Sequence, residues 1–128
     1  AGIVPVITHP ERNALLQQRL EELEGWVEQG CRLQVTAQSF LGRFGRQARE
    51  FAELLVRRGL VHVVASDAHD AEDRPPDLAG AFDYLRRKYG EEPARQLLID
   101  NPRCVLESAP IQATQKLIST GRKWYRFW

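Results

Sequence analysis

Apolar and polar positions follow one another along the chain in a pattern that predicts strands and helices in turn. Residues 3–7 are apolar and predict a buried strand, and leucines and valines spaced by three and four residues then predict a helix that ends at Gly30. Residues 33–36 predict a second strand, and a second amphipathic helix follows before Gly59. This alternation is typical of parallel βα units.

The most β-prone stretch lies at residues 60–65, where branched side chains form a nearly unbroken run. Such a run is expected of a parallel strand that is covered on both faces. A polar loop follows, then a helix that closes at Gly90 and a fourth helix that is predicted to end at the Asn-Pro pair of 101–102. The fold class is therefore α/β. Three strands are few, since sheets average about 5 to 6, so we expect a partner or a further segment to complete this one.

The composition limits the number of domains, the type of partner and the cellular location that we expect. The chain has 128 residues, 43% of them hydrophobic, which is enough for one globular domain. Its charges nearly cancel, at +1, so no strong field favours a nucleic-acid partner. We expect a soluble cytoplasmic protein, because there is no long apolar run and no signal-peptide pattern. The strand-like start and the lack of methionine lead us to expect part of a longer chain.

Candidate metal ligands lie where two predicted strands end, which is where parallel α/β folds collect functional groups. His9 follows the first strand, and Asp67 and His69 follow the central one, two residues apart and so on one side of an extended chain. Carboxylate and imidazole donors suit Mn²⁺, Fe²⁺ or Zn²⁺ better than Ca²⁺. These three ligands would form only a partial centre. A single histidine is more often structural, and we assign that role to His62, within the strand.

Two arginines follow these candidate ligands closely, Arg12 after His9 and Arg74 after His69. Guanidinium groups bind phosphate oxygens through paired hydrogen bonds, so the two predict a phosphate site. The alternative for any loop arginine is a solvated surface charge. The glycine-bearing segment 41–45 lacks the spacing of a phosphate cradle and is interpreted as a loop before a helix.

Taken in order, these motifs resemble a known family. His-Pro-Glu-Arg at 9–12, the segment 34–45, Ser-Asp-Ala-His at 66–69 with Arg-Pro-Pro at 74–76, and Asn-Pro at 101–102 are similar to the PHP superfamily. Within it, the chain most resembles the manganese-dependent protein-tyrosine phosphatases of capsular and exopolysaccharide operons. The resemblance covers about residues 3–107.

This resemblance implies a distorted (β/α)₇ barrel with a polynuclear metal centre, most often Mn²⁺. It also implies action on phosphotyrosine in the tail of a bacterial tyrosine kinase that controls polymer export. The implied site residues are the metal ligands His9, Asp67 and His69 and the phosphate-binding pair Arg12 and Arg74, whereas no ligand role is carried over to Glu11. The family's opening His-x-His strand has no counterpart here, so this chain alone is expected to be inactive, with an incomplete metal centre.

Two regions are expected. Residues 1–107 would form the C-terminal part of a PHP phosphoesterase domain. Residues 108–128 would form a basic aromatic tail, because no acidic residue follows Glu107 while lysine and arginine alternate with aromatic side chains. The tail is expected either to pack against the body or to contact an anionic membrane surface.

Two alternative functions stay open. The chain could be a non-catalytic half barrel that forms a homo-oligomer through its open sheet edge. It could instead serve a PHP phosphatase for a small phosphate monoester such as histidinol phosphate. A cysteine-based phosphatase is disfavoured, because Cys31 and Cys104 lie in neither motif.

Overall fold

Three parallel strands form one sheet in the order β1-β2-β3 in the computed structural model, which describes residues 2–115. The strands are β1 (Val6–Thr8), β2 (Arg32–Thr36) and β3 (Val63–Ala65). Their register pairs Thr8 with Gln34 and Thr36 with Ala65. Because neighbouring strands run in the same direction, their carboxyl ends open on one edge of the sheet, where the predicted site residues follow β1 and β3.

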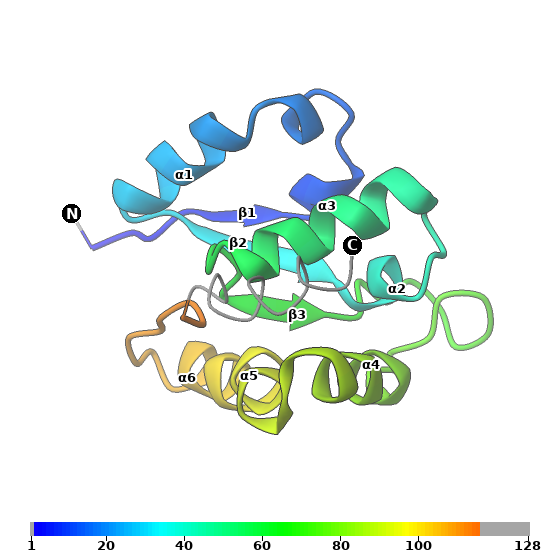
Figure 1. Cartoon of the computed structure of the whole chain (residues 1–128). Coiled ribbons are helices and arrows are strands. Elements are labelled where there is room, and N and C mark those ends of the chain that lie inside the picture. Colours follow the sequence, from blue (N-terminus) through cyan, green and yellow to red (C-terminus); the bar gives the residue numbers. More distant parts are fainter. Residues whose placement is uncertain (1, 116–128) are drawn as a thin grey trace.

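Helices connect the strands and cover the sheet (Figure 1). The α-helices are α1 (Leu20–Glu28), α2 (Ala37–Phe40), α3 (Arg46–Arg57), α4 (Ala79–Tyr89), α5 (Glu91–Arg95) and α6 (Asn101–Leu106). Shorter turns are the 3₁₀ segments η1 (Pro10–Arg12) and η2 (Leu16–Gln18) and the π-helical segment η3 (Gln96–Asp100). Figure 1 shows α4, α5 and α6 following one another beside β3, with α1 and α3 nearer β1 and β2.

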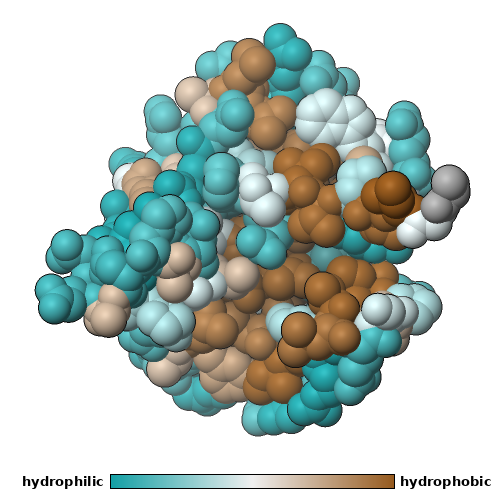
Figure 2. Space-filling model, turned by 180° about the vertical axis from the view of Figure 1, so that it is seen from behind, coloured by the Kyte–Doolittle hydropathy of each residue, from teal (hydrophilic) through white to brown (hydrophobic). Residues whose placement is uncertain are grey.

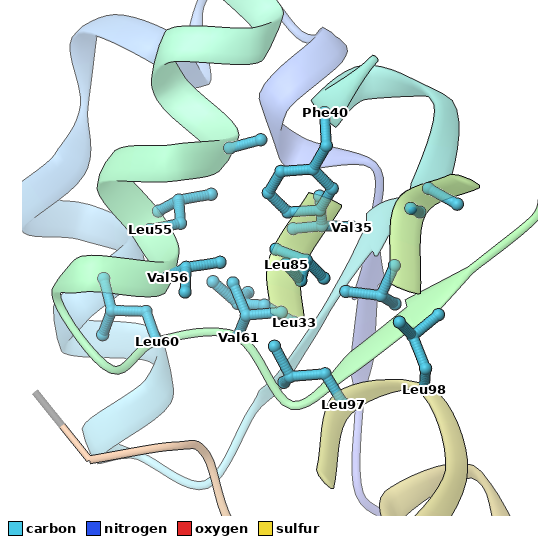
Figure 3. Close-up of a cluster of buried hydrophobic side chains, with 14 of the residues drawn as sticks. Leu33, Val35, Phe40, Leu55, Val56, Leu60, Val61, Leu85, Leu97 and Leu98 are labelled. Atoms are coloured by element: carbon cyan, nitrogen blue, oxygen red, sulfur yellow. The ribbon is translucent and has the colours of Figure 1, made fainter. Parts of the chain in front are cut away.

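The core lies where β2 and β3 meet the apolar sides of α3, α4 and η3 (Figure 3). Leu33 and Val35 of β2, Leu55 of α3, Leu85 of α4 and Leu97 of η3 are all buried. A fully buried leucine contributes roughly 2 kcal/mol through the removal of apolar surface from water. This packing fixes the strands whose ends carry the candidate site.

Most of the elements predicted from the pattern are confirmed, with changed boundaries. The α/β class, the parallel sheet and the loop before α3 are as predicted. The prediction of a buried strand at residues 3–7 is wrong in two respects: β1 begins only at Val6, and Val6 is exposed, because β1 lies at the edge of the sheet. The central strand begins only at Val63, although residues 60–62 before it are buried. Figure 2 shows the molecule from behind the view of Figure 1, and apolar residues also gather on this face.

The prediction that the fourth helix ends at the Asn-Pro pair is wrong, because helix continues as α6 to Leu106. Two features allow this continuation. The π-helical η3 changes the hydrogen-bond spacing just before the pair, and Pro102 lies in the first turn of α6, where a missing N–H costs little. The Asn101 side chain instead fastens the helix, as its Nδ2 donates to the carbonyls of His62 at 2.6 Å and Gln112 at 2.8 Å.

His62 has the structural role predicted for it. It is buried, and its Nδ1 accepts a hydrogen bond of 3.1 Å from the backbone N–H of Leu33 in β2. Burial, and secondarily the positive charge of Arg32, lower the pKa of His62 to about 4, so the neutral ring is the form that the core accommodates.

No helix within residues 2–115 has the length and apolar character needed to cross a bilayer. The predicted tail at 108–128 lies outside the described residues from position 116 onward.

Candidate phosphate-binding and metal site

The backbone is strained where two of the predicted metal ligands lie. Among residues 2–115, three non-glycine residues have φ in the left-handed range, and they are His9 (φ 40°), Asp67 (φ 52°) and Ser108 (φ 55°). Such conformations are uncommon outside glycine and gather at functional sites. His9 is held there by its N–H, which donates to the carbonyl of Gln34 at 2.8 Å. The chain thus turns sharply at the ends of β1 and β3.

Arg12 and Arg74 converge on one oxygen of Asp67. Nη1 of Arg12 lies 2.7 Å from Oδ2 of Asp67, and Nη2 of Arg74 lies 2.6 Å from the same oxygen. Arg74 Nη2 also donates to the backbone carbonyl of Asp67 at 3.3 Å. The three side chains are about a quarter exposed, at 23%, 27% and 27% for Arg12, Arg74 and Asp67. Oδ1 of Asp67 takes part in neither ion pair.

This convergence sets the charge of the site. Desolvation alone would raise the pKa of Asp67, but the hydrogen bond and charge of Arg12, together with the charge of Arg74, outweigh it and lower that pKa. Asp67 is therefore ionised at neutral pH. Two cations face one anion in this cluster, and the carboxylate of Asp70, which accepts from the backbone N–H of Arg74 at 2.9 Å, offsets part of the remaining positive charge.

A hollow of about 610 Å³ opens beside Arg12. Its walls include Arg12, Gln17, Phe44 and the first turn of α3. Arg12 and Phe44 thus line this hollow, whereas Asp67, His69 and Arg74 do not.

His69 is oriented by the residue two positions before it. Its Nδ1 lies 2.7 Å from the backbone carbonyl oxygen of Asp67. Because a carbonyl oxygen only accepts, Nδ1 carries the proton, and Nε2 of the neutral ring is left with its lone pair. Ligating histidines are commonly held in this way by a backbone carbonyl on the other nitrogen.

The donor chemistry fits a divalent metal only in part. Oδ1 of Asp67 and Nε2 of His69 offer an oxygen and a nitrogen of the type that Mn²⁺, Fe²⁺ and Zn²⁺ accept. His9, on the other side of β2, is not brought into one cluster with them. Within residues 2–115, no group of three or more His, Cys, Asp or Glu side chains is arranged to hold a metal ion. The described part of the chain thus offers two neighbouring metal donors, Asp67 and His69, and a third donor, His9, that lies apart from them.

A model of the family described as "Capsular polysaccharide synthesis, CpsB/CapC" matches residues 1–107. The chain belongs to the CpsB/CapC family. The resemblance inferred from the segments at 9–12 and 66–69 is therefore confirmed, and the match ends where the basic tail was predicted to begin.

Other members of the CpsB/CapC family are similar over most of this chain. The tyrosine-protein phosphatase CpsB of Streptococcus pneumoniae is 36% identical over 110 residues, and the tyrosine-protein phosphatase YwqE of Bacillus subtilis is also 36% identical over 110 residues. These alignments cover 82% and 86% of this chain but 45% and 43% of the relatives. The chain thus spans less than half the length of the relatives that it matches.

A solved structure supports the same fold. It is one of the crystal structures of YwqE from Bacillus subtilis and CpsB from Streptococcus pneumoniae, which are described as unique metal-dependent tyrosine phosphatases. It superposes with a TM-score of 0.82 at 35% identity and covers 88% of this chain and 45% of the solved chain. The parallel α/β arrangement is therefore that of the CpsB/CapC family.

Glu11 is a buried carboxylate next to Arg12, and the family motif assigned no role to it. It is fully buried, and its Oε1 accepts hydrogen bonds from the backbone N–H of Thr36 at 2.9 Å and from Ser39 Oγ at 2.7 Å. These bonds join η1, which carries Arg12, to the end of β2. Within the described residues, Oε2 is buried without a hydrogen-bond partner. The only sequence signal for Glu11 was its place between two candidate residues.

Proposed function

We propose that this chain supplies the phosphate-binding part of a metal-dependent protein-tyrosine phosphatase of capsule or exopolysaccharide synthesis. One observation carries the proposal: Arg12 and Arg74, from loops after different strands, meet on a single oxygen of Asp67. Membership of the CpsB/CapC family supports it, since relatives of this chain are named tyrosine-protein phosphatases.

Arg12 and Arg74 would bind the phosphoryl group of the substrate. Each guanidinium has five donors, so it can bind phosphate oxygens while keeping one hydrogen bond to Asp67. Asp67 then fixes where both groups point. Donors held in place before the reaction stabilise the charge on the phosphoryl oxygens without a reorganisation cost, which is how such groups lower a barrier.

Asp67 through Oδ1 and His69 through Nε2 would hold one metal ion, and His9, which lies apart from them, would bind a further ion of a polynuclear centre; we propose Mn²⁺, with Fe²⁺ or Zn²⁺ as alternatives. A metal in such a centre supplies a coordinated water of lowered pKa and positive charge beside the phosphoryl group. Further ligands would come from a complete (β/α)₇ barrel, to which this chain contributes one part. We therefore expect these 128 residues alone to be inactive.

The substrate that we propose is phosphotyrosine in the tail of a bacterial tyrosine kinase, in the cytoplasm. The test is manganese-dependent phosphate release by the full-length protein, with a phosphotyrosyl peptide compared with histidinol phosphate. We expect preference for the peptide and loss of turnover in Asp67→Ala. Unchanged turnover in Asp67→Ala would remove the proposal, and preference for histidinol phosphate would reassign the substrate to a small monoester.

A second candidate function is self-association through the edge of β1. Val6 in this strand is 51% exposed, and Ile3 and Val4 before it are 87% and 53% exposed. An edge strand with exposed apolar side chains favours pairing with another chain. Light scattering of this chain across a range of concentrations tests it, and a monomer at the highest concentration would count against it.

Peripheral membrane contact through the tail is a further proposal, which concerns residues mostly outside the described part. Binding of anionic liposomes should fall when the residues after Gly121 are removed. Equal binding with and without them would dismiss it.

A further inference from the structure

Phe44 lies in the turn between α2 and α3, in the glycine-bearing segment that the proposed function has not used. Gly42 (φ 85°) and Gly45 (φ 96°) flank it, and the N–H of Gly45 donates to the carbonyl of Gly42 at 3.1 Å. A Cβ at either glycine would meet no atom within 4 Å, so backbone conformation, not lack of space, favours glycine there. The two glycines let the turn present the half-buried Phe44 ring to the site.

Both site arginines lie over the ring of Phe44. Cζ of Arg12 is 3.9 Å from the ring centroid, and Cζ of Arg74 is 5.9 Å from it. A cation within about 6 Å of an aromatic centroid is attracted by the negative face of the ring. One aromatic side chain thus contacts two guanidinium groups that come from loops far apart in the sequence.

The ring and Asp67 hold the arginines in different ways. Asp67 takes up N–H donors, which a phosphate group would also need. A ring at a stacking distance contacts the flat face of a guanidinium and leaves the N–H groups in its plane available. Each bond to Asp67 uses an N–H donor, whereas the contact to Phe44 uses none of the donors that a phosphate group would need.

We infer that Phe44 is a positioning residue that keeps Arg12, and more weakly Arg74, in the orientation that binds a phosphoryl group. That the ligand is a phosphoryl group rests on the proposed function. That Phe44 positions the arginines rests on their distances to its ring. It predicts that an aromatic residue is required at this position, and that an apolar side chain of similar size does not suffice.

The ring contact can be tested on this 128-residue chain without catalysis. The Nε–Hε signal of Arg12 is recorded by NMR and assigned through its loss in Arg12→Lys. We expect it upfield in the wild type and in Phe44→Tyr, and shifted downfield in Phe44→Leu. Tyr84→Leu is the control, since Arg49 and Lys88 lie over the Tyr84 ring at 5.2 Å and 5.5 Å from its centroid. It should leave the Arg12 signal in place.

The consequence for binding is tested with inorganic phosphate and the manganese-loaded full-length protein, by calorimetry. Phe44→Leu should weaken phosphate binding roughly fivefold, the usual strength of an exposed cation–π contact, and Phe44→Tyr should restore it. Tyr84→Leu should bind as the wild type does. An unmoved Arg12 signal, or unchanged affinity in Phe44→Leu, would overturn the inference. If phosphate binding depends on Phe44 but the full-length protein shows no turnover, the proposed function is contradicted and the role of Phe44 in positioning the arginines is not.

Discussion

Asp67 and Glu53 are each held by a pair of cations, and the two clusters differ in whether they leave a carboxylate oxygen free. In the Asp67 cluster, two arginines bind Asp67 Oδ2 and Oδ1 joins neither contact. In the Glu53 cluster, which joins α3 to α4, Oε1 accepts from Tyr84 and from Arg49 Nε at 3.4 Å, while Oε2 pairs with Lys88 Nζ at 2.9 Å. Both oxygens of Glu53 are used.

The backbone separates the two clusters as well. Glu53 lies in the regular helix α3, whereas Asp67 has left-handed φ and lies two residues after the end of β3. Helical spacing brings Arg49 to Glu53, one turn away, so the helix itself builds that contact. A carboxylate with both oxygens satisfied in regular structure stabilises the fold, and one with a spare oxygen at a strained turn is suited to a ligand.

The largest expected difference between the clusters is in catalysis by the full-length protein. Asp67→Asn should lower kcat/KM for a phosphotyrosyl peptide on the order of 100-fold or more, because it weakens metal ligation and releases both arginines. Glu53→Gln should keep kcat/KM near the wild-type value. Steady-state kinetics on samples shown to be folded by thermal melting measures both. Comparable losses in the two variants would end the functional distinction between the clusters.

Conservative changes of the arginines should sharpen the comparison. Arg12→Lys should lower kcat/KM roughly 10- to 100-fold, because lysine keeps the charge but loses the planar fork that aligns phosphate. Arg49→Lys, in the Glu53 cluster, should have little effect on kcat/KM. The same kinetics measures both, and full activity in Arg12→Lys would mean that only the charge matters.

The contribution of the Glu53 cluster to stability should depend on pH. Desolvation alone would raise the pKa of Glu53. The hydrogen bonds from Tyr84 and Lys88 outweigh desolvation and lower the pKa of Glu53 below its ordinary value of 4.5. The unfolded chain therefore binds more protons just below pH 4.5, and the free energy of unfolding falls as pH falls through that window. Glu53→Gln should flatten this fall in urea titrations of this chain. An unchanged slope would show that Glu53 is not stabilised as described.

The smallest expected effect is that of Tyr84→Phe. Removing the hydroxyl deletes one hydrogen bond to Glu53 and should lower the free energy of unfolding by about 1 kcal/mol, while phosphatase activity stays the same. Chemical denaturation and kinetics on the same preparation measure the two quantities. A fall in activity without a fall in stability would place the Glu53 cluster in the catalytic machinery.

The sequence predicted the outline of the fold and the convergence of Arg12 and Arg74 near Asp67, whereas the roles assigned to these residues stay predictions. Apolar spacing located α3 and α4, and parallel strand ends located His9, Asp67 and His69 on one edge, because these follow from period and topology. The family motif paired Arg12 with Arg74, and the structure brings both to one oxygen.

Other features depend on tertiary contacts that no local pattern encodes. The burial of Glu11 depends on Thr36 and Ser39 at the end of a neighbouring strand. The helix through Pro102 depends on a π-helical segment before it. The approach of Arg12 and Arg74 to the Phe44 ring requires two loops to meet a third. The left-handed φ of His9 likewise cannot be predicted from the residue types around it.

The most direct measurement is a crystal structure of the full-length protein with manganese and orthovanadate, an analogue of the phosphoryl group in transfer. The account predicts vanadate within hydrogen-bonding distance of both Arg12 and Arg74, with Asp67 and His69 among the ligands of a neighbouring manganese ion. Vanadate bound away from the two arginines, or a metal centre without Asp67, would contradict it.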